Sequence, residues 1–263
     1  SDLLKGTTVE LMKMGEPGVP EMNAYIEEVL KEGETLGFDG RVVSVGEGEG
    51  YAAIAGKKNA KVNYQVDLID EIWEDRPVLS EEPAFNLDVK YAGETVASKL
   101  ARIREEMKEA GTNVHVVSTI DDICWTLNIR GNDIDFFPLV LSYGIITMDS
   151  FELYIDEKKL DDKLKAKLAK DGVNLHPYND IYEDVKKFGS DVVAMIDPGK
   201  LNYALFNNIP ENVKTVEKRN PAILMKAIKN PVEIENIRKA QIKDSVAHVR
   251  FMKWLKENVG KMR

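Results

Sequence analysis

The sequence contains few of the residues that build covalent staples or metal sites. Its 263 residues include a single cysteine, Cys124, which excludes an internal disulfide and a zinc site made of four thiolates. The three histidines, His115, His176 and His248, do not stand at ligand spacings such as H-x-x-x-H. We therefore expect no metal bound by this chain alone, and we interpret each histidine as structural and Cys124 as a buried, inert thiol.

Several functional signals are missing as well. No apolar run is long enough to cross a bilayer, and residues 1–10 lack the basic and apolar regions of a secretory signal, so we predict a cytoplasmic protein. The net charge of -9 argues against nucleic acid or an anionic membrane as the main partner. The sequence has no G-x-S-x-G or P-loop motif, and the glycine-rich residues 44–51 carry two glutamates that would repel a phosphate. We interpret that stretch as a turn into a helix.

What the sequence does contain is a regular alternation of helical and strand patterns. Apolar residues at helical spacing predict a helix over residues 95–110, and a β-branched run predicts a strand over residues 114–117. A second helix should begin near Thr119 and end at Gly131, and two strands should flank a tight turn at residues 149–150. The pattern continues to residue 216 and predicts an α/β fold with a mixed β-sheet flanked by helices.

The first part of the chain resembles an incomplete copy of the later part. The order of elements after Asp39-Gly40 mirrors the order after Asp197-Pro198-Gly199, which indicates a divergent duplication. Before Asp39 we find only a predicted strand at residues 7–14 and a helix at residues 21–30, so we expect the chain to start inside a domain. A long amphipathic helix opens at Pro231, and its apolar face would pack on a following domain or on the preceding one.

One polar corner stands between two apolar segments and provides the candidate site residues Asn128, Arg130 and Asp133. Structurally, Arg130 would complement the negative end of the preceding helix and pair with Asp133 or Asp135. Functionally, a loop of this kind would present a rigid cation and an acceptor to a peptide terminus or to another domain.

These features together resemble the Xaa-Pro aminopeptidase family, also called aminopeptidase P, in its three-domain form. The resemblance extends over essentially the whole chain. It is carried by ELMKMG (10–15), DLIDEIWEDRP (67–77), DDICWTLNIRGNDIDFFPLVLSY (121–143) and KAIKNPVEIENIRKAQIKDSVAHVRFMKWL (226–255). The last two of these segments are specific, and the first two are weaker.

The resemblance implies a domain plan and a function. Residues 1–77 would be the rear half of a first creatinase-like N-terminal domain, with a ribonuclease H-like fold, residues 78–230 a second one, and residues 231–263 the first helix of a "pita-bread" catalytic domain. Family members cleave before proline with two divalent ions, usually manganese, held by two aspartates, one histidine and two glutamates. None of these ligands matches a position here, so we expect this region to be inactive alone and to shape substrate access and assembly.

Other interpretations remain open at this level. The implied partners are a peptide with proline second, the chain's own catalytic domain and a second subunit in a homodimer. A non-enzymatic pseudo-peptidase module that binds basic proteins is an alternative, since the overall charge is negative. Kinship with creatinases or dipeptidases is a third possibility, which the Leu-Asn-Ile-Arg-Gly-Asn-Asp run makes less favourable.

Overall fold

The computed structural model describes residues 4–261, and these divide into two compact units. The first unit comprises residues up to Val78 together with Pro198–Pro210, and the second comprises Leu79–Asp197 and Glu211 onward. Residues 198–210 thus leave the second unit between two of its strands and belong to the first.

The first unit is a small α/β structure around two parallel strands. Its elements are α1 (Met22–Val29), β1 (Thr35–Gly37), α2 (Val45–Lys57), β2 (Lys61–Asn63) and α8 (Tyr203–Asn207). Ser44 begins α2 with a capping box, in which its hydroxyl accepts from the Glu47 amide and the Glu47 carboxylate accepts from the Ser44 amide. The prediction of a turn for this glycine-rich stretch is wrong, because Gly46, Gly48 and Gly50 lie within the first turns of α2 itself.

The strand predicted at residues 7–14 is wrong, because the described structure there is irregular. Val9, Leu11 and Met14 are each more than half exposed. A strand requires a neighbouring chain to receive its backbone hydrogen bonds, and no strand of the described residues lies beside this segment. The alternation of residue types alone was therefore insufficient to fix the local structure.

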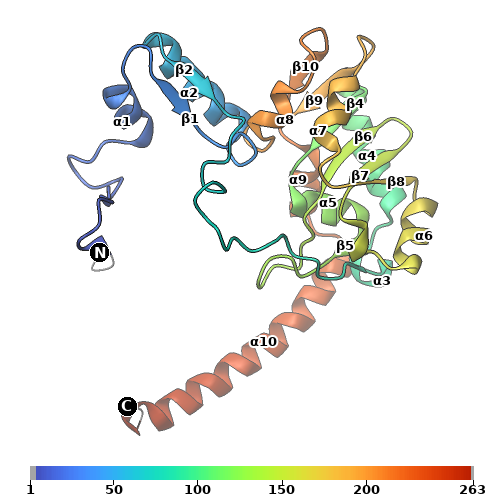
Figure 1. The fold of residues 1–263 in the computed structure, drawn as a ribbon. Coiled ribbons are helices and arrows are strands. Elements are labelled where there is room, and N and C mark those ends of the chain that lie inside the picture. The colour runs from blue at the N-terminus through green and yellow to red at the C-terminus, as the bar shows by residue number, and fades with distance from the viewer. Residues whose placement is uncertain (1–3, 262–263) are drawn as a thin grey trace. The chain divides into compact units, whose positions relative to one another are not determined.

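The second unit is built on a six-stranded mixed sheet in the order β10-β9-β4-β6-β7-β8 (Figure 1). The pairs of β9 with β10, β9 with β4 and β7 with β8 are parallel, and β6 pairs antiparallel with both β4 and β7. The strands are β4 (Val114–Val117), β6 (Tyr143–Thr147), β7 (Phe151–Tyr154), β8 (Val173–His176), β9 (Val193–Ile196) and β10 (Lys214–Glu217). The predicted mixed α/β fold and the hairpin around residues 149–150 are confirmed.

The remaining elements of the second unit flank this sheet and lead into the last helix. A short antiparallel pair joins β3 to β5, away from the main sheet. The elements are β3 (Phe85–Asn86), α3 (Val89–Ala92), α4 (Val96–Glu109), α5 (Ile120–Leu127), β5 (Ile129–Arg130), α6 (Asp162–Lys170), α7 (Ile181–Asp184), α9 (Pro221–Ala227) and α10 (Pro231–Asn258), with 3₁₀ turns at Glu157–Lys159, Val185–Lys187 and Val259–Lys261.

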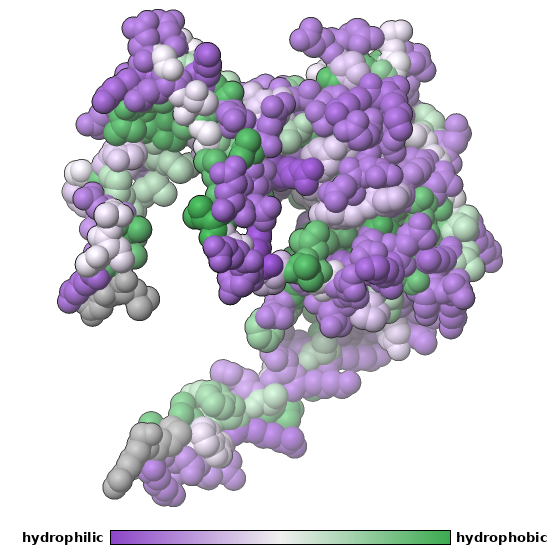
Figure 2. Space-filling model, in the orientation of Figure 1, coloured by the Kyte–Doolittle hydropathy of each residue, from purple (hydrophilic) through white to green (hydrophobic). Residues whose placement is uncertain are grey.

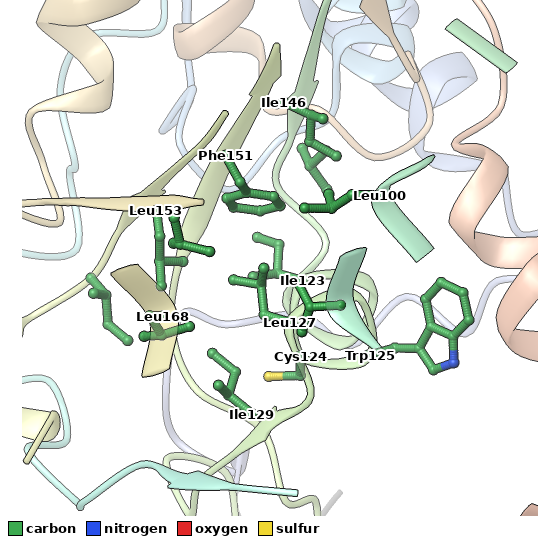
Figure 3. Packing of buried hydrophobic residues seen from close by; sticks show 14 of the residues in the cluster. Leu100, Ile123, Cys124, Trp125, Leu127, Ile129, Ile146, Phe151, Leu153 and Leu168 are labelled. Carbon is green, nitrogen blue, oxygen red and sulfur yellow. The ribbon is translucent and has the colours of Figure 1, made fainter. Parts of the chain in front are cut away.

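The hydrophobic core lies between one face of the sheet and helices α4, α5 and α6. Alternate strand residues such as Ile146, Phe151 and Leu153 point into it, and Leu100 and Ile123 meet them from the helices (Figure 3). Helix α7 packs on the opposite face of the sheet. There the ring of its Tyr182 lies edge-on against the ring of Tyr143 of β6, with the ring centres 5.9 Å apart. The apolar spacing in the sequence thus identifies the buried faces of α4 and α5.

The end of helix α5 and the start of helix α10 are each fixed by particular residues. The predicted end of α5 at Gly131 is wrong, because the helix stops at Leu127 and Asn128 adopts a left-handed conformation with φ 52°. Asparagine tolerates this conformation better than most residues, and its buried side chain is held by hydrogen bonds. Helix α10 begins with a capping box between Asn230 and Glu233, with Pro231 at its first position as predicted.

Candidate functional site

Asn128, the first residue of the polar corner, has a structural role. Its side chain is 1% exposed, its Oδ1 accepts from Lys99 Nζ at 2.7 Å, and its Nδ2 donates to the Glu94 carbonyl at 2.9 Å. Asn128 therefore ties α5 to the start of α4 and positions the Lys99 ammonium.

Arg130 caps the preceding helix. Its Nη1 donates to the carbonyls of Cys124 and Ile129, both at 2.8 Å, so the guanidinium neutralises the negative end of α5 as predicted. Burial lowers the pKa of Arg130 from its ordinary value. The predicted ion pair of Arg130 with Asp133 or Asp135 is wrong, because no ion pair within residues 4–261 involves Arg130 and Asp133 pairs with another cation.

The partner of Asp133 is Lys159, whose Nζ lies 2.6 Å from Asp133 Oδ2. Both side chains are almost fully buried, at 3% exposure for Lys159 and 0% for Asp133. The same Oδ2 accepts from the Leu141 amide at 2.7 Å, whereas Oδ1 has no hydrogen-bond partner among the described residues. Asp133 thus fixes the loop that follows Arg130, with its carboxylate turned inward.

A cavity of about 760 Å³ opens beside Arg130 in the second unit. Its walls come from α3, α4, α5, the loop after β5, α9 and the first turns of α10. The lining residues are Leu87, Tyr91, Ala92, Lys99, Asp121, Trp125, Arg130, Pro138, Leu139, Lys226, Lys229, Glu233, Asn236, Ile237 and Ala240. Of the three predicted site residues, the structure brings Arg130 to this cavity, and Asn128 and Asp133 are not among its lining residues.

Lys99 is a residue of the cavity that the sequence pattern alone does not reveal as a site residue. It is 1% exposed, its Nζ donates to the Trp125 carbonyl at 2.7 Å, and it lies 4.3 Å from the centre of the Trp125 ring. Burial lowers its pKa from 10.5 to about 8. Its position in the sequence is the signal that could identify it as a site residue. Lys99 follows Val96 by three residues and so lies on the buried face of α4, where it is the one charged residue.

Charges around the cavity are unequal. Four cations, Lys99, Arg130, Lys226 and Lys229, face two carboxylates, Asp121 and Glu233. Asp121 already pairs with Lys226, and the Glu233 carboxylate accepts from the Asn230 amide in its capping box. In a chain of net charge -9, the cavity is thus a locally positive place.

Cys124 lies on helix α5, just before the polar corner in the sequence, and is buried. The Val140 amide donates a hydrogen bond to its Sγ at 3.4 Å. Burial raises the pKa of the thiol from 9.0 to about 11. Because the thiolate is the reactive form, the folded chain should hold roughly 100-fold less of it at neutral pH than an exposed cysteine.

We therefore predict that Cys124 reacts with a disulfide reagent at least 100-fold more slowly in the native chain than in urea. Absorbance at pH 7.5 measures both rates, and free glutathione provides the reference in each solvent. Equal rates in the two solvents would contradict the burial of this thiol.

The described residues offer no group of three or more histidine, cysteine, aspartate or glutamate side chains arranged to hold a metal ion. Of the histidines, His115 is buried between the Met195 carbonyl and the Asn220 side chain, and His176 contacts Glu152 at 2.6 Å. Within residues 4–261 no helix is both long enough and apolar enough to cross a membrane.

Comparisons with known proteins agree with this architecture. Residues 75–233 match the model of the creatinase/prolidase N-terminal domain, and the chain belongs to this family. The relatives include Xaa-Pro aminopeptidase 1 of Dictyostelium discoideum, 34% identical over 95% of this chain, and aminopeptidase P2 of Arabidopsis thaliana, 31% identical over 95%. The chain spans 41% and 40% of those two proteins. The predicted resemblance to Xaa-Pro aminopeptidases is confirmed.

A solved structure is similar over nearly the whole chain. The X-prolyl aminopeptidase of Caenorhabditis elegans, described as a cytosolic enzyme with a di-nuclear active site, matches with a TM-score of 0.89 and 30% identity. The match covers 94% of this chain and 41% of that one. The fold is therefore shared with the corresponding part of a larger peptidase.

Proposed function

We propose that this chain is the N-terminal, non-catalytic region of a cytoplasmic, metal-dependent Xaa-Pro aminopeptidase, an enzyme that releases the residue preceding proline. The observation that carries the proposal is how much of this chain, and how much of its relatives, the alignments cover. Aminopeptidase relatives align with 95% of this chain, and the aligned part is about two fifths of their length. Within the proposed plan, residues 1–77 and 78–230 are two creatinase-like domains, and residues 231–263 begin the catalytic domain.

Under this proposal the parent enzyme holds two divalent ions, which we expect to be manganese, outside the region described here. Two ions sharing one hydroxide would supply the nucleophile and stabilise the oxyanion. The side chains of residues 4–261 do not provide that donor set. We assign to this region substrate access and assembly.

Helix α10 supports the assembly role. Over its described length, Pro231–Asn258, none of its residues is buried. Hydrophobic side chains are visible along it in Figure 2. Those that are more than a third exposed are Val232, Ile234, Ile237, Ile242, Val246, Val249, Phe251, Met252 and Trp254. An apolar surface of this size on one helix suits packing against a further domain, which we propose is the catalytic one, or against a second subunit.

An assay on two lengths of protein tests the proposal. With added Mn²⁺, the full-length aminopeptidase should hydrolyse an X-Pro-X tripeptide, and the 263-residue chain should not. Turnover by the 263-residue chain alone would overturn the assignment. A full-length protein that folds, binds Mn²⁺ and leaves every X-Pro peptide intact would favour a binding module instead.

The access role is tested by Arg130→Ala in the full-length enzyme. Loss of a charged hydrogen-bond donor beside the substrate should lower kcat/KM for an X-Pro-X tripeptide about 10–100-fold. Arg219→Ala is the matched control, because Arg219 is an exposed arginine outside the cavity lining. Kinetics of Arg130→Ala equal to those of the control would remove Arg130 from substrate access.

A further inference from the structure

The guanidinium of Arg130 is anchored on one side only. Its Nη1 serves the carbonyls of Cys124 and Ile129, whereas Nε and Nη2 donate no hydrogen bond within residues 4–261. In the same described part, the one buried side-chain nitrogen or oxygen without a partner is Asp133 Oδ1. The free Nε and Nη2 donors are therefore accessible to solvent, on a residue that lines the cavity.

This geometry leaves the edge of arginine that binds carboxylates available. The Nε and Nη2 donors lie parallel and match the two oxygens of a carboxylate, which gives a bidentate, charge-assisted pair. Because Nη1 is held by two carbonyls, the orientation of the guanidinium is fixed before any ligand arrives. A pre-oriented donor loses little side-chain entropy on binding.

The surrounding charges favour an anion at the same place. Lys99 lies within the wall and gives its hydrogen bonds to two neutral acceptors, the Trp125 carbonyl and Asn128 Oδ1. Among the described ion pairs none involves Lys99 or Arg130, and the one carboxylate of the cavity that acts on both cations, Glu233, does so without a direct ion pair. In a partly buried site, two cations that share one carboxylate keep an excess of positive charge, which attracts an anion more strongly than it would in water.

The other walls define what accompanies the anion. Trp125, Leu139 and Ile237 are apolar surfaces of the same cavity, and its volume of about 760 Å³ lies in the range of small-molecule and peptide sites. A ligand that combines a carboxylate with an apolar side chain therefore fits both parts of the cavity.

We propose that the Nε and Nη2 edge of Arg130 binds the C-terminal carboxylate of a short peptide, with Lys99 adding positive potential and Trp125 and Leu139 contacting the last side chain. This assignment deepens the proposed function, since it would let the non-catalytic region select short peptides by their far end. The binding itself requires only the residues of the 263-residue chain.

The test titrates the whole chain with Ala-Pro-Leu as the free acid and as the C-terminal amide. Of its three tryptophans, Trp73 and Trp254 are exposed, so Trp73→Phe and Trp254→Phe leave Trp125 as the reporter in the cavity wall. We expect a saturable change in Trp125 fluorescence with the acid and at least 10-fold weaker binding of the amide. Acetate should compete with the acid, which tests the site without altering it.

Two variants complete the test. Arg130→Gln should weaken binding of the acid at least 10-fold, and Arg219→Gln, an exposed arginine outside the lining, should not. Equal binding of acid and amide, or absence of acetate competition in the unmodified cavity, would overturn the proposal even if Arg130→Gln failed to fold. An Ala-Pro-Glu amide that binds as tightly as the free acid would overturn the C-terminal assignment in favour of a side-chain carboxylate.

The outcomes also separate this inference from the proposed function. If the full-length enzyme cleaves X-Pro peptides while the chain discriminates no carboxylate, only the carboxylate site is lost. If the chain binds the acid but the full-length protein shows no peptidase activity with Mn²⁺, the site stands and the proposed function fails.

Discussion

Replacing Lys159 by alanine is expected to reduce the free energy of unfolding of the second unit by about 3–5 kcal/mol, because the change leaves the Asp133 carboxylate buried without its cation. Both side chains are almost fully shielded from water, and their charged atoms are 2.6 Å apart. After the change the carboxylate would keep only the Leu141 amide on Oδ2, because Oδ1 has no hydrogen-bond partner among the described residues.

Urea denaturation followed by circular dichroism measures this effect. Lys158→Ala is the matched control, because the neighbouring Lys158 pairs with Glu81 at the surface and should have no measurable effect. A double variant, Asp133→Leu with Lys159→Met, should recover most of the lost stability, since it removes both charges and keeps the volume filled. If Lys159→Ala behaved like its control, the burial of the pair would be wrong.

The comparison of these two lysines shows what sequence alone can establish. Lys158 and Lys159 are adjacent and chemically identical, and nothing local predicts that one is exposed and the other buried. The difference arises because Lys159 meets Asp133, which is 26 residues away in the chain. Proximity in sequence favours Arg130 as the partner of Asp133, and the fold instead supplies Lys159 from another segment.

Elements with strong local periodicity were predicted well. Helix α4 and strand β4 follow from the spacing of Val96, Leu100 and Val116, since each pattern is compatible with one regular structure. The candidate site was predicted in part. Arg130 was found because a charged residue between apolar segments is conspicuous, whereas Lys99 was missed because its neighbours on α4 read as an ordinary apolar stripe.

The strand expected at residues 7–14 shows where prediction from a local sequence pattern fails. Val9 and Leu11 have the alternation of a half-buried strand, yet they are exposed and irregular. A helix satisfies its own backbone hydrogen bonds, but a strand depends on a neighbour that the segment itself does not specify. Strand predictions therefore fail more readily than helix predictions when the neighbouring chain is not identified.

Raising the pH from 8 to 9.5 is expected to stabilise the native chain relative to a Lys99→Met variant by about 2 kcal/mol. Burial lowers the pKa of Lys99 to about 8 in the folded state, against 10.5 for the free side chain. Below pH 8 both states hold the proton, so Lys99 contributes no pH dependence. Between pH 8 and 10.5 the unfolded state binds more protons, and stability rises with pH by up to about 1.4 kcal/mol per unit.

Other groups act in the opposite direction at high pH, which is why the variant is needed. Burial raises the pKa of Cys124 to about 11 and also raises the pKa of Tyr143, so the unfolded chain loses these protons first and stability falls above pH 9. Those contributions are common to both proteins and cancel in the difference between them. Lys108→Met serves as control, because Lys108 is exposed on the same helix and pairs with Glu105.

The measurement is the free energy of unfolding in urea at pH 7.5, 8.5 and 9.5 for the unaltered chain and both variants. A difference between the unaltered chain and Lys99→Met that stays constant over this range would show that Lys99 keeps its proton in the folded state. Loss of the proton also removes the positive charge of Lys99, a cation of the cavity that forms no ion pair within residues 4–261. Binding of a peptide carboxylate should then weaken over the same pH range in which the folded chain gains stability, because both changes follow from neutralising Lys99.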